Sequence, residues 1–85
     1  MKVKVLFFAS LREQLGTAAE ELELPAGVAT VGALREHLIA RGGVWASAME
    51  KRKNVRAAVN QDMAKPGEAI RTGDEIAFFP PVTGG

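Results

Sequence analysis

Cysteine is absent from the 85 residues of this sequence, and histidine occurs once. Without cysteine the chain has no disulfide framework, no thiolate zinc site and no cysteine nucleophile. His37 falls on an expected helix, with no second histidine and no acidic partner at the spacing of a metal site or a catalytic triad. We therefore expect no bound metal, and we expect His37 at or near the surface rather than in an active site.

Charge of one sign and long apolar runs are also scarce. Eleven Lys and Arg against ten Asp and Glu give a net charge of +1, which gives no indication of nucleic-acid binding. No stretch reaches the roughly 18–20 apolar residues that span a bilayer, and the apolar run after the basic start is too short for a signal peptide. We expect a soluble, cytoplasmic protein that binds neither nucleic acid nor membranes.

The apolar fraction, 47%, is that of a globular protein, and residues 1–85 are expected to form a single domain. Residues 2–9 are rich in β-branched and aromatic side chains and predict a first strand, while "EELELP" predicts a second. A short helix is expected between them. Ser10 and Glu13 have the spacing of a capping box at its start, and Gly16 can end it.

The main helix is predicted after Thr30, a suitable N-cap. The apolar residues that follow recur at helical spacing, namely Val31, Leu34, Leu38 and Ile39. Gly42-Gly43 is expected to end this helix. A second amphipathic segment follows, and its apolar side is predicted to consist of Val44, Trp45, Ala48 and Met49.

Two further strands are predicted in "NVRAAVN" and "EIAFFP", separated by a type II turn in "KPGE" and another turn in "TGD". The order strand, short helix, strand, long helix, strands is that of an α+β domain. We expect a mixed sheet with the main helix packed on one face, and with the first and last strands side by side.

Alternation along the first and last strands puts apolar side chains on both faces of the sheet. If Val3, Val5 and Phe7 face the core, Leu6 and Phe8 point the other way, and Phe79 does the same in the last strand. If these strands are neighbours, Leu6, Phe8 and Phe79 form an apolar patch of the kind that marks a partner interface. Cover by a loop or a helix is the alternative.

The sequence closes on "FFPPVTGG". Pro80 and Pro81 have no N–H to donate and hold φ near the polyproline value, so they would end the sheet and form a stiff spacer. Gly84 and Gly85 have no Cβ and would fit a channel too narrow for any other residue. We expect residues 80–85 to be an extended tail whose reactive group is the terminal carboxylate.

A carboxylate is a poor electrophile at neutral pH, where it is ionised. It must become a mixed anhydride, most simply an acyl-adenylate, before it can take up sulfur or an amine. Gly42-Gly43 lacks the Lys and Ser/Thr of a phosphate-binding loop, so a separate activating enzyme would consume the ATP. We expect a carrier with no bound cofactor and no catalytic site of its own, and the residues leave open whether it counts as part of an enzyme.

The segments "LFFASLRE", "TVGALREHL", "AAVNQ" and "GDEIAFFPPVTGG" resemble the small subunits of molybdopterin synthase, which are ubiquitin-like sulfur carriers of the β-grasp fold. The resemblance covers essentially the whole chain. It implies that an activating enzyme adenylates Gly85, and that a sulfur donor such as a persulfide converts it to a thiocarboxylate. The tail would then enter the large synthase subunit and pass sulfur to the cyclic pyranopterin precursor. Two transfers would build the dithiolene of molybdopterin, in a complex of two small and two large subunits.

The resemblance also implies a partner interface made of Phe8, Met63 and Phe79, beside Leu6. Met63 departs from the family in side-chain type but stays apolar, and methionine tolerates irregular contacts. Three alternatives stay open: a sulfur carrier for another pathway such as thiamine synthesis, a ubiquitin-like modifier joined to proteins through Gly85, and a plain binding module. The basic run "EKRK" at 50–53 is either a solvated loop or a contact for an acidic partner.

Overall fold

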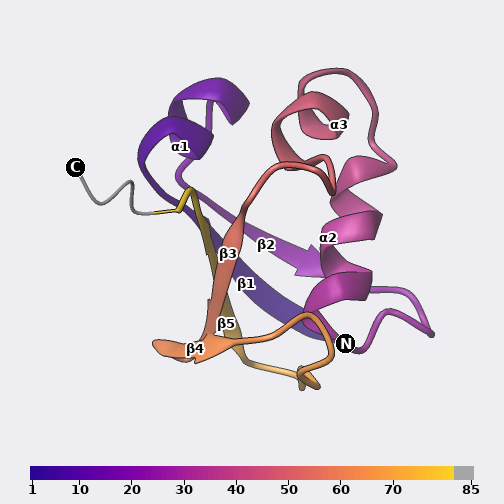
Figure 1. The fold of residues 1–85 in the computed structure, drawn as a ribbon. Helices are drawn as coiled ribbons and strands as arrows, with labels where there is room; N and C mark the ends of the chain where they lie inside the picture. Colours follow the sequence, from indigo (N-terminus) through magenta and orange to yellow (C-terminus); the bar gives the residue numbers. More distant parts are fainter. Residues whose placement is uncertain (82–85) are drawn as a thin grey trace.

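The computed structural model describes residues 1–81, which form a mixed sheet with helices on one face (Figure 1). The elements are β1 (Lys2–Phe7), α1 (Ala9–Leu15), β2 (Ala19–Glu23), α2 (Val31–Ile39), α3 (Gly43–Met49), β3 (Arg56–Val59), β4 (Asp62–Ala64) and β5 (Glu75–Phe79). The strand order is β2-β1-β5-β3-β4, with β1 and β5 parallel and the other neighbours antiparallel. The predicted α+β class is therefore confirmed, as is the pairing of the first and last strands.

The inner face of the sheet carries the core. The buried side chains of β1 and β5 are Val3, Val5, Phe7, Ile76 and Phe78. The rings of Phe7 and Phe78 stack with their centroids 6.4 Å apart, and the Trp45 ring of α3 meets Phe7 edge-on at 5.4 Å. Aromatic rings contribute much of the buried area in a core of this size. The inward residues predicted for both strands are confirmed.

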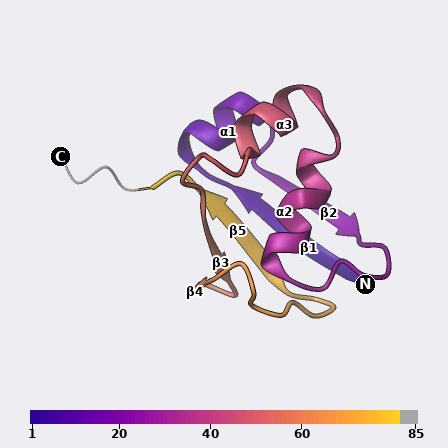
Figure 2. The ribbon, with the colours of Figure 1, turned by 45° about the vertical axis from the view of Figure 1, so that its right-hand side comes forward.

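The helix α2 packs across the inner face, on the same side of the sheet as α1 and α3 (Figure 2). The Thr30 hydroxyl accepts a hydrogen bond from the Ala33 N–H at 3.1 Å, which satisfies one of the free donors at the start of the helix. Val31, Leu34 and Leu38 are buried. The predicted cap and apolar stripe of the main helix are therefore confirmed.

The start of α1 differs from the prediction, because Ser10 is not its N-cap. Phe8 stays extended and its N–H donates to the Phe78 carbonyl at 3.1 Å, so that pairing with β5 continues past the end of β1. Phe8 becomes the N-cap without a side-chain cap bond, and Ala9 takes a left-handed φ of 53°. Sheet pairing has overridden the capping-box pattern. Gly16, with a φ of 72°, does end the helix.

Gly42-Gly43 does not end α2, which already stops at Ile39. Gly42, with a φ of 76°, is instead the N-cap of α3. This turn sets the phase of α3 so that Met49 is fully buried, whereas Val44 is 45% exposed. The prediction that Val44 belongs to the apolar side is therefore wrong.

The segment between β3 and β5 also departs from the prediction. The strand β4 has three residues, too few for alternation to indicate a strand. The predicted turn in "KPGE" is present, closed by a hydrogen bond from the Glu68 N–H to the Lys65 carbonyl at 2.9 Å. However, Gly67 does not have the positive φ that a type II turn requires, so the predicted turn type is wrong.

Within residues 1–81, no helix has the length and apolar character needed to cross a membrane. The same residues bring together no group of three or more His, Asp or Glu side chains that could hold a metal ion. His37 lies partly buried on α2.

Candidate interaction site on the outer face of the sheet

The outer face of the sheet carries a continuous apolar row. In the strand register Leu6 lies opposite Ala19 on one side and Ala77 on the other, and the row continues through Ala58 to Met63. Ala58 is buried at 8% exposure. Ala58 is nevertheless not part of the hydrophobic core on the inner face. The neighbouring residue, Ala57, does belong to that core. The outer face therefore has an apolar surface of its own.

A second row lies nearer the end of β5. Phe79 pairs with Arg56 of β3, and Phe8, which is extended, follows Phe7 in its pairing with Phe78. Phe8 is 46% exposed, whereas Phe79 is partly buried. We call Leu6, Phe8, Ala58, Met63, Ala77 and Phe79 the outer patch.

The other end of the outer face is charged. Lys4 lies between Glu21 of β2 and Glu75 of β5 in the register. Near it the N-terminal ammonium contacts the Glu23 carboxylate at 2.9 Å. The hydrogen bond and charge of that ammonium lower the pKa of Glu23 from its ordinary value. The outer patch thus has a sharp polar boundary, which is typical of a specific interface.

The helices of the described residues leave the outer patch open, because all of them lie on the opposite side of the sheet (Figures 1 and 2). Met63 is 62% exposed and Phe8 46%, large values for side chains of this size. The alternative to a partner interface, cover of the patch by a helix, is therefore absent among residues 1–81. Large exposed apolar side chains grouped on one surface favour contact with a partner.

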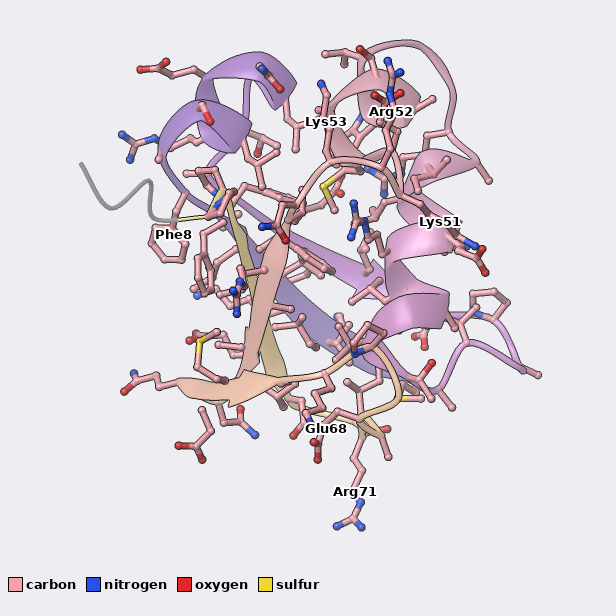
Figure 3. The ribbon with its side chains drawn as sticks, in the orientation of Figure 1. Phe8, Lys51, Arg52, Lys53, Glu68 and Arg71 are labelled. Atoms are coloured by element: carbon pink, nitrogen blue, oxygen red, sulfur yellow. The ribbon has the colours of Figure 1, made fainter. Side chains whose placement is uncertain are left out.

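The outer patch and the start of the tail lie at the same end of the molecule. The hydrogen bond from the Phe8 N–H to the Phe78 carbonyl joins the end of β1 to the end of β5. Figure 3 shows Phe8 beside the point where the chain leaves the sheet and directed away from α2 and α3. Pro80 and Pro81 follow β5 and are partly buried. The predicted residues Gly84 and Gly85 lie outside the described residues.

The sequence did not indicate every residue of the outer patch. Leu6, Phe8, Ala77 and Phe79 follow from alternation, but the place of Ala58 in the patch depends on the pairing of β3 with β5. Arg56, opposite Phe79, adds a positive charge at the rim of the patch. Only the register of the strands could have found these residues, and one sequence does not contain it.

Solved structures of other proteins share this fold. SAMP1 from Haloferax volcanii, in its crystal structure, is 31% identical and superposes with a TM-score of 0.76 over 100% of both chains. The complex of subunits 1 and 2 of molybdopterin-converting factor from Helicobacter pylori 26695 contains a chain with a TM-score of 0.67 over 100% of both chains. Because that chain is only 21% identical, the likeness shows a shared fold and nothing more. These likenesses define the class: a ubiquitin-like β-grasp protein.

Sequence comparison gives the family. The ThiS family matches residues 5–85. The molybdopterin synthase sulfur carrier subunit of Escherichia coli (strain K12) is 51% identical over 83 residues, which cover 98% of this chain and 99% of the relative. The chain belongs to the ThiS family, among its molybdopterin synthase sulfur carrier subunits. The resemblance read from the sequence is confirmed.

Proposed function

We propose that this chain carries sulfur on the carboxyl group of Gly85 and delivers it within molybdopterin synthase. The observation that carries the proposal is an open apolar patch at the end of the sheet where the tail begins. The family match that extends through Gly85 supports it. Phe8, Met63 and Phe79 would hold the partner, and Pro80 and Pro81 would direct the tail toward it.

The carboxylate of Gly85 must first be activated. We infer that an activating enzyme joins it to AMP from ATP, with release of pyrophosphate. The outer sulfur of a persulfide donor then attacks the carbonyl carbon and AMP leaves, which gives an acyl disulfide. A thiol of the donor system attacks the donor sulfur of that S–S bond, forms a disulfide with it and releases the thiocarboxylate. The thiocarboxylate is a softer and stronger nucleophile than the carboxylate, which suits attack on the cyclic pyranopterin precursor. Two such transfers supply both sulfurs of the dithiolene.

The proposed partner at the outer patch is the large subunit of molybdopterin synthase, in a complex of two small and two large subunits. The side chains of the patch are apolar and can bind a partner, but they cannot transfer protons. Proton transfer would therefore come from the large subunit, and ATP chemistry from the activating enzyme. We place the carrier in the cytoplasm, and we propose that it binds no cofactor, metal, nucleic acid or membrane itself.

A protein modifier is the second candidate function. It is favoured by the structural likeness to SAMP1, which is also known as small archaeal modifier protein 1. In that role the activated Gly85 would form an isopeptide bond with a lysine of another protein. The higher identity to the sulfur carrier subunit, 51% against 31%, favours the carrier. An isopeptide-linked adduct would favour the modifier instead, and a carrier for another pathway such as thiamine synthesis would deliver sulfur to a different acceptor.

The experiment that tests the proposal adds one alanine after Gly85. The added residue moves the carboxyl group beyond the position that the activating enzyme must reach, so we expect molybdopterin formation to be lost. Affinity for the large subunit, measured by calorimetry, serves as the control for folding and docking. Continued molybdopterin formation by the extended variant would refute the proposal.

A further inference from the structure

A groove of about 880 Å³ opens between α2 and the β3–β4 edge of the sheet. Its walls include Val31 of α2, Ala57 of β3 and Ala64 of β4, which are apolar. Met63, a member of the outer patch, lines the groove as well. The groove and the outer patch are therefore continuous around the β4 edge, although they face different sides of the sheet.

The rim of the groove is strongly basic. Six cationic residues line it: Arg35, Lys51, Arg52, Lys53, Arg56 and Lys65. Among the described residues that line the groove, Glu36 is the one with an acidic side chain. These residues have an excess of five positive charges, so the net charge of +1 for the whole chain leaves an excess of four negative charges elsewhere. Separation of charge on this scale produces a local positive field that attracts an acidic partner.

Some of the charges on the rim are already paired. Lys51 contacts Glu36, and Arg52 contacts Glu50. Within residues 1–81, Lys53, Arg56 and Lys65 form no ion pair with an acidic side chain. These cations face solvent at the groove and can pair with carboxylates from another molecule.

Arg35 holds the basic loop in place. Its guanidinium group donates hydrogen bonds to the carbonyl oxygens of Met49 at 2.8 Å, Glu50 at 2.6 Å and Lys53 at 2.9 Å. Burial lowers the pKa of Arg35 from its ordinary value, but an arginine stays charged in proteins. The loop from α3 to β3, which carries Lys51, Arg52 and Lys53 (Figure 3), is thereby fixed at one end of the groove. A loop held in this way loses less conformational entropy on binding.

We propose that this groove binds an acidic, partly apolar segment of a protein partner. The unpaired cations recognise carboxylates, and the apolar walls hold alternate hydrophobic side chains of the same segment. The shared Met63 lets a partner seated on the outer patch reach the groove around β4. A small phosphate compound fits less well, because it would contact the basic rim and leave the apolar walls uncovered. The proposal does not depend on the chemistry of Gly85.

The test is an NMR titration of the whole chain with a short peptide that alternates glutamate and leucine. We expect amide shifts in residues 50–56, 64 and 65, and binding that weakens as salt is added. The double variant Lys53→Glu/Lys65→Glu should bind the peptide roughly tenfold more weakly, since two favourable pairs become repulsive. The matched control is Arg12→Glu/Arg71→Glu, which makes the same change in net charge at exposed positions outside the groove.

Equal loss of affinity in both double variants would overturn the proposal, because net charge alone would then explain the binding. So would the absence of peptide binding to the unchanged chain, or equal binding of a peptide in which lysine replaces glutamate. Inorganic pyrophosphate is the second probe: shifts in the same amides with pyrophosphate but not with the peptide would assign the groove to a phosphate compound instead. None of these failures affects the sulfur-carrier proposal, which the Gly85 extension tests separately.

Discussion

At the scale of single residues, Phe79 is the member of the outer patch that directly precedes the proline spacer. It is partly buried at the end of β5, opposite Arg56 and one residue before Pro80. We expect Phe79→Lys to weaken binding of the large subunit about thirtyfold, since an interface aromatic is commonly worth about 2 kcal/mol. Calorimetric titration of the large subunit measures the change.

The control for this variant is Thr72→Lys, which adds the same charge in the exposed turn that precedes β5. This turn lies beside the start of β1, at the opposite end of β5 from Phe79. The control variant should bind the large subunit as the unchanged chain does. Both variants should unfold cooperatively near the temperature of the unchanged chain. Unchanged affinity of Phe79→Lys would remove this residue from the proposed interface.

Asp74 links stability to pH through its hydrogen bonds. Its carboxylate accepts hydrogen bonds from the Asn60 side chain at 3.0 Å and from the Arg71 N–H at 2.8 Å. These bonds hold the pKa of Asp74 below its ordinary value. Because the pKa is lower in the folded state, the stabilisation is complete above the unfolded value of about 3.9 and disappears as pH falls through the folded value.

We therefore expect Asp74→Ala to lower the free energy of unfolding by about 1 kcal/mol at neutral pH, the net value of such hydrogen bonds. The difference from the unchanged chain should shrink as the pH falls below about 4. Urea unfolding at a series of pH values measures it. Asp62→Ala, at an exposed position on β4, is the matched control. A difference for Asp74→Ala that stays constant down to low pH would contradict the assignment.

At the scale of elements, Arg35 connects α2 to the end of α3 and to the loop before β3. Removal of its guanidinium leaves the carbonyl oxygens of Met49, Glu50 and Lys53 without these donors. We expect Arg35→Ala to lower the free energy of unfolding by about 2 kcal/mol. This is less than the sum for three hydrogen bonds to a charged group, because water can replace part of the lost donors. Chemical unfolding measures the total effect.

Hydrogen exchange measures where the effect of Arg35→Ala falls. The amides of Lys53 and Val55, which bond within this loop, should exchange faster, while those of β1 should not. Arg35→Lys is the matched variant. It keeps the charge but loses the planar fork, so it should recover only part of the stability. Full recovery by Arg35→Lys would show that the charge, rather than the three hydrogen bonds, holds the loop.

The elements differ in how far the sequence determines them. The faces of β1 and β5 follow from alternation, because every second side chain must enter the core. The cap at Thr30 and the stripe of α2 follow from local pattern as well. The strand β4 is too short for a pattern. The start of α1 depends on a tertiary contact, its pairing with β5. The phase of α3 depends on the left-handed turn at Gly42, whose conformation the Gly-Gly pair permits but does not dictate.

The candidate site divides in the same way. Leu6, Phe8 and Phe79 could be predicted because alternation is local. Arg35 could not, because its three acceptors lie 14 to 18 residues further along the chain. The basic groove also combines α2 with β3, β4 and the loop before β3, and no spacing in the sequence brings these together. The run "EKRK" showed that this loop is basic, but not that it lies beside α2, β3 and β4 at the groove.

At the scale of the whole molecule, the β-grasp fold does not decide between sulfur carriage and protein modification. SAMP1 superposes on this chain with a TM-score of 0.76, and the outer patch would suit a partner in either role. The two functions differ in what becomes attached to Gly85: a sulfur atom in the carrier, or a lysine of another protein in the modifier. The decision therefore depends on the chemistry of that carboxyl group.

The most direct measurement is the intact mass of the chain after incubation with the activating enzyme, ATP and a sulfur donor. Sulfur carriage predicts a mass increase equal to the difference between one sulfur and one oxygen atom, localised to Gly85 by fragmentation. The variant with an alanine after Gly85 should show no such increase under the same conditions. An unchanged mass of the native chain, with an activating enzyme shown to be active on another carrier, would contradict the account.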